Sequence, residues 1–273
     1  MTGVSWIEES GTCAGPICIT NTHAVGVVHH AVVRWTTQVH PDVAEGWLLP
    51  VVAETWDGYL NDINGFHVTP ADAILALDHA KAGPVAEGNV GGGTGMVCYE
   101  FKCGTGTASR RTSAAGGYTV GVLVQANHGA RYQLQIAGAP VGRLLTENAP
   151  FTKGKDLDNE RGSIIIVVAT DAPLLPHQLR RRAKRAALGL ARTGSRAGNG
   201  SGDIFVAFST ANPDAPKLEQ QLASASFVPN DRINPLFNAV VLATEEAIVN
   251  ALVAAETMTG FDGHRVEAIP HDR

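Results

Sequence analysis

The sequence of 273 residues has little charge of either sign, few aromatic residues and only four cysteines. Charged residues make up 17% of the chain, the formal net charge is -5 and the pI is near 6.0. Proteins that bind nucleic acids usually carry a basic face and a high pI, so this balance argues against that class. Small solutes or peptides are better matched as partners.

The chain also lacks the segments that mark export or membrane insertion. No hydrophobic segment led by lysine or arginine opens it, and we expect no apolar run long enough to span a bilayer. The sequence therefore predicts a cytoplasmic protein with no membrane partner. Hydrophobic residues still make up 44% of the chain, which is ample for a buried core.

The cysteines form two pairs, Cys13 with Cys18 and Cys98 with Cys103, and each pair has four residues between its members. Zinc sites and disulfides are both conceivable. Structural zinc pairs usually have a tighter spacing, however, and Cys98 lies in an apolar run, as a small core residue does. We therefore expect reduced thiols, no metal site and no cofactor.

Hydrophobic periodicity divides the chain into strands and helices. Alternating or continuously apolar segments predict strands at 4–8, 16–21, 49–55, 106–110, 118–126, 131–136, 163–170 and 204–210. Apolar residues at three- and four-residue steps predict helices at 24–38, 176–191 and 235–258, and a capping box predicts another at 69–81. Asn234 is expected to cap the last of these. Strand clusters separated by packed helices indicate an α+β sandwich.

Two other stretches are polar. Residues 148–161 have the composition of an exposed linker, and the basic run 180–185 is expected on a solvated helix face. The glycine-rich stretch 88–96 is not a P-loop, because no lysine followed by serine or threonine is present, and Met96 stands where a dinucleotide motif needs its third glycine. A structural or substrate-side loop fits it better.

Serines beside glycines raise the question of a serine hydrolase. No G-x-S-x-G elbow surrounds Ser163, Ser195 or Ser201. A dispersed Ser-His-Asp triad with His128 or His177 as the base stays open, because such triads are recognised by geometry rather than by spacing.

Ser163 stands between the polar stretch 148–161 and the apolar strand predicted at 163–170. A serine hydroxyl needs a base at neutral pH, and a free α-amine, with a pKa of roughly 8, can serve. Cleavage of the bond between Gly162 and Ser163 would place the nucleophile and the base on one residue. Gly162 suits a strained bond because it has no Cβ.

Six motifs resemble one family. They are ITNTH at 19–23, ETWDGYLND at 54–62, GNVGGGTGM at 88–96, VLVQAN at 122–127, GSIIIVVATDAP at 162–173 and GNGSGDI at 198–204. Together they resemble the DmpA-type aminopeptidases, which include L-aminopeptidase/D-amidase-esterases and β-peptidyl aminopeptidases, among the self-processing N-terminal-nucleophile hydrolases. The resemblance runs through nearly the whole chain.

The resemblance implies a four-layer αββα sandwich in a single domain, 1–273. Self-cleavage would divide this domain into an α-chain, 1–162, and a β-chain, 163–273. Family members carry a further amino-terminal segment before the residues aligned with Val4, so the front segment of the fold is expected to be missing.

The resemblance also implies roles for individual residues. Ser163 takes the position of the nucleophile, and Asn127 matches the amide that stabilises the oxyanion. Ser201 and Asp203 match the pair that orients the nucleophile with its amine, although many relatives have glutamate where Asp203 stands.

Asp57 and Tyr59 lie in the loop that resembles the pocket for the substrate amino group. The implied activity is exo-acting hydrolysis of the amide or ester bond after an N-terminal amino-acyl residue, in short peptides or amino-acid amides and esters. The L-, D- or β-preference stays open. The resemblance also implies a homo-oligomer, such as a tetramer of processed α/β pairs.

Two other functions stay open on the residues alone. One is a histidine-assisted serine hydrolase that does not cleave itself, with His128 or His177 as its base. The other is a binding or assembly protein on the same fold, which would use residues 180–185 to hold an acidic partner.

Overall fold

The computed structural model describes residues 1–113, 116–151, 162–215 and 221–272. Its largest sheet contains, in spatial order, β5 (Thr105–Arg111), β6 (Thr119–Asn127), β7 (Ser163–Thr170) and β8 (Ile204–Ser209). The first two pairs are antiparallel, and β7 runs parallel to β8. The strands predicted for these four segments are confirmed to within one residue at each end.

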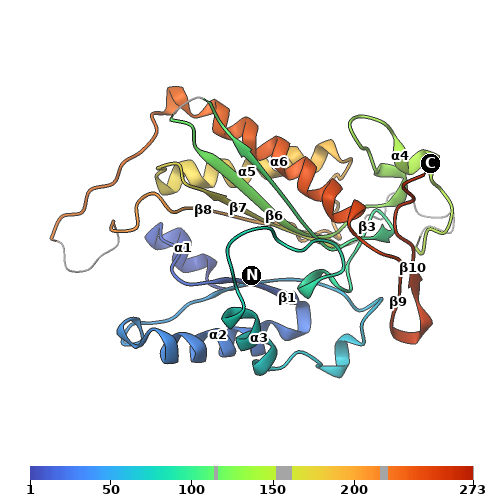
Figure 1. Ribbon diagram of the computed structural model, residues 1–273, viewed down its shortest axis with the longest axis horizontal. Helices are drawn as coiled ribbons and strands as arrows, with labels where there is room; N and C mark the ends of the chain where they lie inside the picture. The colour runs from blue at the N-terminus through green and yellow to red at the C-terminus, as the bar shows by residue number, and fades with distance from the viewer. Residues whose placement is uncertain (114–115, 152–161, 216–220, 273) are drawn as a thin grey trace.

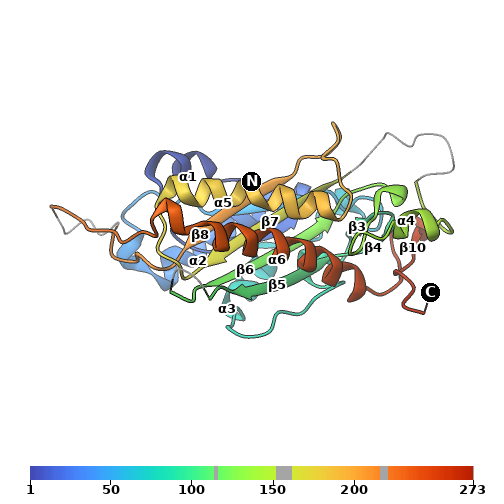
Figure 2. The ribbon, with the colours of Figure 1, turned by 90° about the horizontal axis from the view of Figure 1, so that it is seen from above.

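Two helices cover one face of this sheet. α5 (Pro176–Arg192) and α6 (Asn234–Val253) run side by side across it, as Figure 2 shows from above. Their buried side chains, including Leu190, Val240 and Ile248, pack on the apolar residues of β6 and β7 in one continuous core. Burial of this apolar surface is the main source of stability for the layer pair.

A second, smaller sheet lies on the other face. It consists of the parallel strands β1 (Ile17–Asn21) and β2 (Val51–Thr55), and α2 (Val25–Val39) and α3 (Pro70–Asp78) cover its outer side. Figure 1 shows the resulting order of helices, sheet, sheet and helices. The predicted α+β fold with four αββα layers is therefore confirmed.

Short elements complete the chain. They are α1 (Val4–Ser10), β3 (Val97–Cys98), β4 (Phe101–Lys102), α4 (Val141–Leu144), β9 (Met258–Thr259) and β10 (Arg265–Val266). The helix α1 corrects the strand predicted at 4–8. Gly3 and Gly11, both at φ 72°, bound a seven-residue helix, which is too short for its period to be told from strand alternation.

The strand predicted at 131–136 is also wrong. Residues Arg131–Gln133 form a 3₁₀ turn, in which the Gln133 side chain accepts a hydrogen bond from the Ala130 N–H at 2.8 Å. The buried Arg131 guanidinium donates to the carbonyls of Leu145 and Glu147 at 2.9 and 2.8 Å. These distant contacts hold the segment in a turn despite its alternating pattern.

Two predicted helices end earlier than expected. α3 ends at Asp78 rather than at Lys81, although its predicted capping box between Thr69 and Asp72 is present. α6 ends at Val253, and Asn234 is its first residue rather than its cap. Nδ2 of Asn89 donates to the Glu256 carbonyl at 2.8 Å, and Oδ1 of Asn89 accepts from the Glu256 N–H at 3.2 Å. These two bonds draw the chain away from the helix axis.

The length and composition of α6 match those of a membrane-spanning segment, with a mean hydropathy of 1.6 over its most apolar window. The prediction that no apolar run is long enough is therefore wrong. More than half of that window is buried inside the protein, against β5, β6 and α5. Its hydrophobicity is that of a core helix.

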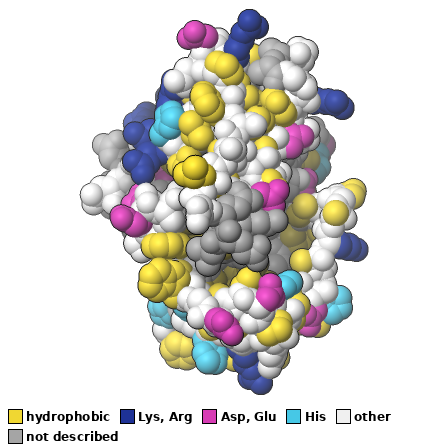
Figure 3. Space-filling model, turned by 90° about the vertical axis from the view of Figure 1, so that its left-hand side faces the viewer, with side chains coloured by type: hydrophobic (Ala, Val, Ile, Leu, Met, Phe, Trp, Pro, Cys, Tyr) yellow, Lys and Arg dark blue, Asp and Glu magenta, His cyan; other side chains and the backbone are white. Residues whose placement is uncertain are grey.

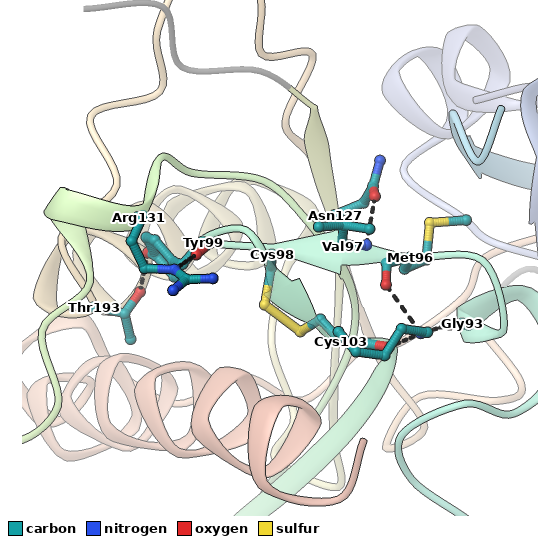
Figure 4. Close-up of a disulfide and its surroundings, with 10 residues drawn as sticks. Gly93, Met96, Val97, Cys98, Tyr99, Cys103, Asn127, Arg131 and Thr193 are labelled. Carbon is teal, nitrogen blue, oxygen red and sulfur yellow. Dashed lines mark hydrogen bonds between the residues drawn. A yellow bond between two sulfur atoms is a disulfide. The ribbon is translucent and has the colours of Figure 1, made fainter. Parts of the chain in front are cut away.

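The expectation of reduced thiols is wrong for one cysteine pair. Cys98 and Cys103 form a disulfide, with their Cα atoms 5.4 Å apart (Figure 4). β3 and β4 form a hairpin whose two turn residues, Tyr99 and Glu100, have positive φ angles of 49° and 60°. This tight turn brings the two cysteines together. Cys13 and Cys18 are free thiols.

The basic run of α5 is only partly solvated. Arg182 is fully buried, and its guanidinium has no hydrogen-bond partner within the described residues. Arg181 and Arg185 lie over the ring of Phe237 on α6, at 5.0 and 4.0 Å from its centroid. Figure 3 shows Lys and Arg side chains at separate places on the left-hand face of the molecule, interspersed with acidic and apolar ones. The burial of Arg182 and the contacts of Arg181 and Arg185 with Phe237 do not favour docking of an acidic partner on residues 180–185.

Candidate active site

The candidate site lies where β6 ends and β7 begins. The two strands are antiparallel, and their register pairs Asn127, the last residue of β6, with Ser163, the first residue of β7. Two predicted site residues far apart in the sequence are thus brought together by strand pairing. The apolar run of β7 fixes this register, because a slip by one residue would turn its buried side chains to the opposite face.

Gly162 has a conformation that only glycine adopts readily, with φ at +84°. A Cβ atom at this position would lie 1.9 Å from the carbonyl oxygen of Asn127. The backbone before Ser163 is therefore held against the end of β6, in a place that no side chain fits.

Residues 201–203 lie across the start of β7. The N–H of Gly202 donates to Ser163 Oγ at 2.9 Å. Oδ1 of Asp203 accepts from the Ile164 N–H at 3.2 Å and also from the Ser201 hydroxyl. The predicted pair Ser201 and Asp203 therefore holds the backbone next to the nucleophile. Although aspartate is shorter than the glutamate expected of many relatives, the carboxylate of Asp203 reaches the Ile164 N–H.

Asn127 is buried, and both ends of its amide are held. Oδ1 accepts a hydrogen bond from the Val97 N–H at 2.9 Å, which Figure 4 shows, and Nδ2 donates to the Trp56 carbonyl at 2.7 Å. Since an amide NH₂ carries two hydrogens, one donor of Nδ2 remains for a ligand. The arrangement suits a fixed donor to a developing negative charge.

Asp57 follows β2, next to Trp56. Its Oδ2 accepts hydrogen bonds from Asn21 at 3.2 Å and Asn61 at 2.9 Å. Its Oδ1 is buried and has no hydrogen-bond partner within the described residues. Burial raises the pKa of this carboxyl above its ordinary value, and the two asparagine donors act against the rise. Asp57 is among the residues that line a cavity of about 570 Å³.

Tyr59 lies in an aromatic cluster. Its ring stacks on His264 at 4.2 Å and meets the edge of Phe151 at 4.8 Å. Nδ1 of His264 is 2.8 Å from the Tyr59 carbonyl, so the cluster links the loop after β2 to the C-terminal region. The structure thus joins Asp57 to the Asn127 network through the adjacent Trp56, whereas Tyr59 is held by other contacts.

Neither candidate histidine is placed as a base for Ser163. His128 is buried, and neither of its ring nitrogens has a partner within the described residues. His177 is exposed near the start of α5, beyond the far end of β7. The eight residues of β7 span roughly 23 Å. Across the described residues, no side-chain base hydrogen-bonds to Ser163 Oγ.

His128 leads to a prediction about acid stability. Burial lowers the pKa of its imidazole to about 3, whereas the unfolded chain takes up the proton near pH 6.5. The stabilising contribution of the neutral ring is complete above pH 6.5 and is lost as the pH falls toward 3, by about 1.4 kcal/mol per pH unit. His128→Phe is expected to reduce the difference in unfolding temperature between pH 7.5 and pH 5.5. His177→Gln, an exposed control, should leave this difference as it is in the wild type. An unchanged difference in His128→Phe contradicts the assignment.

Several participants were missed at the sequence level. Gly202 and Val97 act through backbone N–H groups, and Trp56 acts through its carbonyl, so none of them shows in residue type. Lys102 is fully buried and donates to the carbonyl of Met96, next to Val97. Its one signal is a lysine within the mostly apolar stretch 96–103, where Glu100 is the other charged residue.

The αββα layers, together with a serine at the head of a central strand and, among the residues that the structure describes, no side-chain base hydrogen-bonded to it, define a hydrolase of the N-terminal-nucleophile type. Similarity to known proteins supports the same class. Residues 1–266 match peptidase family S58, and the chain belongs to this family. The predicted family, fold class and assignment as an enzyme are thereby confirmed.

Three relatives show how close the similarity is. The β-peptidyl aminopeptidase BapA of Sphingosinicella microcystinivorans is 54% identical over 99% of this chain and 70% of its own length. The structure of an L-aminopeptidase D-Ala-esterase/amidase from Ochrobactrum anthropi, described as a variant of the Ntn hydrolase fold, matches with a TM-score of 0.93 and 50% identity, over 99% of this chain and 75% of that one. A Burkholderia sp. β-aminopeptidase matches with a TM-score of 0.89 and 49% identity, over 98% and 74%.

Proposed function

We propose that this chain is a self-processing serine aminopeptidase in which Ser163 is first the agent of cleavage and then the N-terminal nucleophile. The observation that carries the proposal is the surroundings of Ser163 Oγ. This atom is bound by the Gly202 N–H, lies beside the glycine-only backbone of Gly162, and has no side-chain base within the described residues. Its base therefore has to be generated, and a free α-amine on the same residue provides one.

Cleavage begins when Ser163 Oγ attacks the carbonyl carbon of Gly162. The C–N bond between the two residues breaks and an ester forms on Oγ. The hydroxyl proton passes to the nitrogen, which becomes the free α-amine. Water then hydrolyses the ester. The products are an α-chain, 1–162, that ends in a carboxylate, and a β-chain, 163–273, that begins with the nucleophile.

In turnover, the α-amine of Ser163 accepts the hydroxyl proton while Oγ attacks the carbonyl carbon that follows the substrate's N-terminal amino-acyl residue. The remaining hydrogen of Asn127 Nδ2 stabilises the oxyanion. The amine product leaves with the proton, and water hydrolyses the acyl-enzyme. Ser201 and Asp203 hold the backbone at Ile164, so the amine and hydroxyl of Ser163 keep their relative orientation.

Asp57 is the proposed partner of the substrate's ammonium group. Its buried Oδ1 needs a donor, and a cation beside it offsets the burial that raises its pKa. Tyr59, in the same loop, is proposed to shape the entrance through its aromatic cluster. A site that requires a free ammonium group acts only at the amino end of a peptide, which accounts for exo-acting hydrolysis.

The substrates proposed are short peptides and amino-acid amides or esters. The names of the relatives include β-peptidyl aminopeptidase and L-aminopeptidase D-Ala-esterase/amidase, so L-, D- and β-amino-acyl groups are all candidates here. A panel of L-, D- and β-amino-acyl p-nitroanilides separates them by kcat/KM. We further propose a homo-oligomer of processed α/β pairs, for which light scattering gives the mass.

Mass spectrometry of the purified protein tests the self-processing step. We expect two fragments that meet at the bond between Gly162 and Ser163, and an Edman sequence of the second that begins Ser-Ile-Ile-Ile-Val. A single intact chain that hydrolyses amino-acyl p-nitroanilides would contradict the proposed mechanism.

A further inference from the structure

Lys102 is a fully buried cation in the hairpin of β3 and β4. Its Nζ donates to three backbone carbonyls: Met96 at 2.9 Å, Gly93 at 3.4 Å and Cys103. It forms no ion pair with a carboxylate within the described residues, and burial lowers its pKa to about 7. An unpaired buried ammonium costs several kcal/mol, whereas an apolar side chain would fill the same space without that cost.

The carbonyl of Met96 and the N–H of Val97 belong to one peptide group. Lys102 holds the oxygen end of this group at 2.9 Å, and the hydrogen end donates to Asn127 Oδ1, also at 2.9 Å. Because the peptide group is planar, fixing its oxygen also fixes the direction of its N–H. A donor at the oxygen end also polarises the group and strengthens the bond from its N–H. Figure 4 shows Asn127 beside Val97, with Met96 next to Val97 and the disulfide nearby.

This bond decides which way the Asn127 amide faces. The Val97 N–H can be received only by Oδ1, and the Trp56 carbonyl only by the NH₂ group, so the two partners exclude the flipped amide. In the flipped orientation the side-chain oxygen would replace the donor that the oxyanion needs. The disulfide between Cys98 and Cys103, the residue that follows Lys102, closes the hairpin in which Val97 pairs with Lys102.

We propose that Lys102 is a positioning residue of the oxyanion donor, acting on Asn127 through the peptide group between Met96 and Val97. This proposal rests on the role proposed above for Asn127. It assigns a catalytic consequence to a side chain that touches neither the substrate nor Ser163.

The test compares Lys102→Met with Arg182→Met. Arg182 is a matched control, because it is also a fully buried cation without an acid partner at hydrogen-bond distance, but it lies in α5. For Lys102→Met we expect kcat on the best amino-acyl p-nitroanilide of the panel to fall about 10- to 100-fold with little change in KM, since the oxyanion donor is misplaced rather than removed. Arg182→Met should keep the wild-type kcat.

Two inhibitors separate positioning from general loosening of the site. An α-amino aldehyde forms a tetrahedral adduct on a serine nucleophile and so presents an oxyanion, whereas the matching amino alcohol has no carbonyl. We expect the Ki of the aldehyde to rise in Lys102→Met by the same factor as the fall in kcat, with the Ki of the alcohol within about twofold of wild type. Equal weakening of both inhibitors, or a wild-type aldehyde Ki, would overturn the proposal.

Lys102→Gln covers the case in which the methionine variant does not fold. Its side-chain amide keeps one neutral donor toward the Met96 carbonyl, so we expect a loss between those of wild type and Lys102→Met, and a wild-type kcat in Lys102→Gln would count against the proposal. Failure of the underlying mechanism is distinguishable. In that case the wild type stays in one piece or Ser163→Ala stays active, whereas failure of the Lys102 proposal alone leaves both of those results as expected.

Discussion

Replacing Ser163 with alanine is expected to leave the chain in one piece and to lower the hydrolysis of amino-acyl p-nitroanilides by about 10⁴-fold or more. The variant loses both the atom that attacks Gly162 and the atom that attacks the substrate. Intact-mass spectrometry gives the state of the chain, and initial rates at saturating substrate give the loss of activity.

Ser209→Ala is the matched control for Ser163→Ala. Ser209 ends β8 and pairs with Thr170 at the opposite end of the sheet, where its hydroxyl donates to the Ala172 carbonyl at 2.6 Å. This variant should process and turn over substrate as the wild type does. A Ser163→Ala chain that hydrolyses the substrate at the wild-type rate would show that the nucleophile lies elsewhere.

Replacing Asn127 with alanine is expected to lower kcat of the processed enzyme by about 10²- to 10³-fold, which corresponds to roughly 3 kcal/mol of transition-state stabilisation. KM should change little, because the hydrogen bond from Nδ2 is needed only when charge develops on the carbonyl oxygen. Steady-state kinetics on the best p-nitroanilide of the panel give both constants.

Asn250→Ala provides the comparison for this variant. The Asn250 amide lies on α6 and donates to the Thr107 carbonyl at 2.8 Å, so it ties a helix to the sheet away from Ser163. Its replacement should leave kcat unchanged. A rise in KM at constant kcat in Asn127→Ala would instead assign Asn127 to substrate binding.

Local patterns accounted for most of the sheet and its covering helices. The apolar run of β7 and the alternation in β5 and β6 predict strands because side chains in a strand alternate between faces. The start of α3 followed from Thr69, Pro70 and Asp72, whose capping bonds involve only neighbours in the chain. Such signals need no knowledge of distant contacts.

Several of the wrong predictions have the opposite cause. The turn at Arg131–Gln133 depends on carbonyls more than ten residues away, and the end of α6 depends on Asn89. Arg182 is buried because α5 packs against both the sheet and its neighbour α6, although its neighbours in the sequence are basic. Tertiary contacts of this kind override local preference, and no short window of sequence contains them.

The sequence by itself determined the family, the layered α+β fold, and the identity of Ser163 as the candidate nucleophile with Asn127, Ser201 and Asp203 as its companions. Only the tertiary structure decided how these groups face one another. The pairing of Asn127 with Ser163, the close approach of Gly162 to β6, and the hold of Lys102 on the peptide group before Val97 all join atoms distant in the chain. Many of these atoms are backbone donors and acceptors, which every residue carries alike, so no residue letter could reveal them.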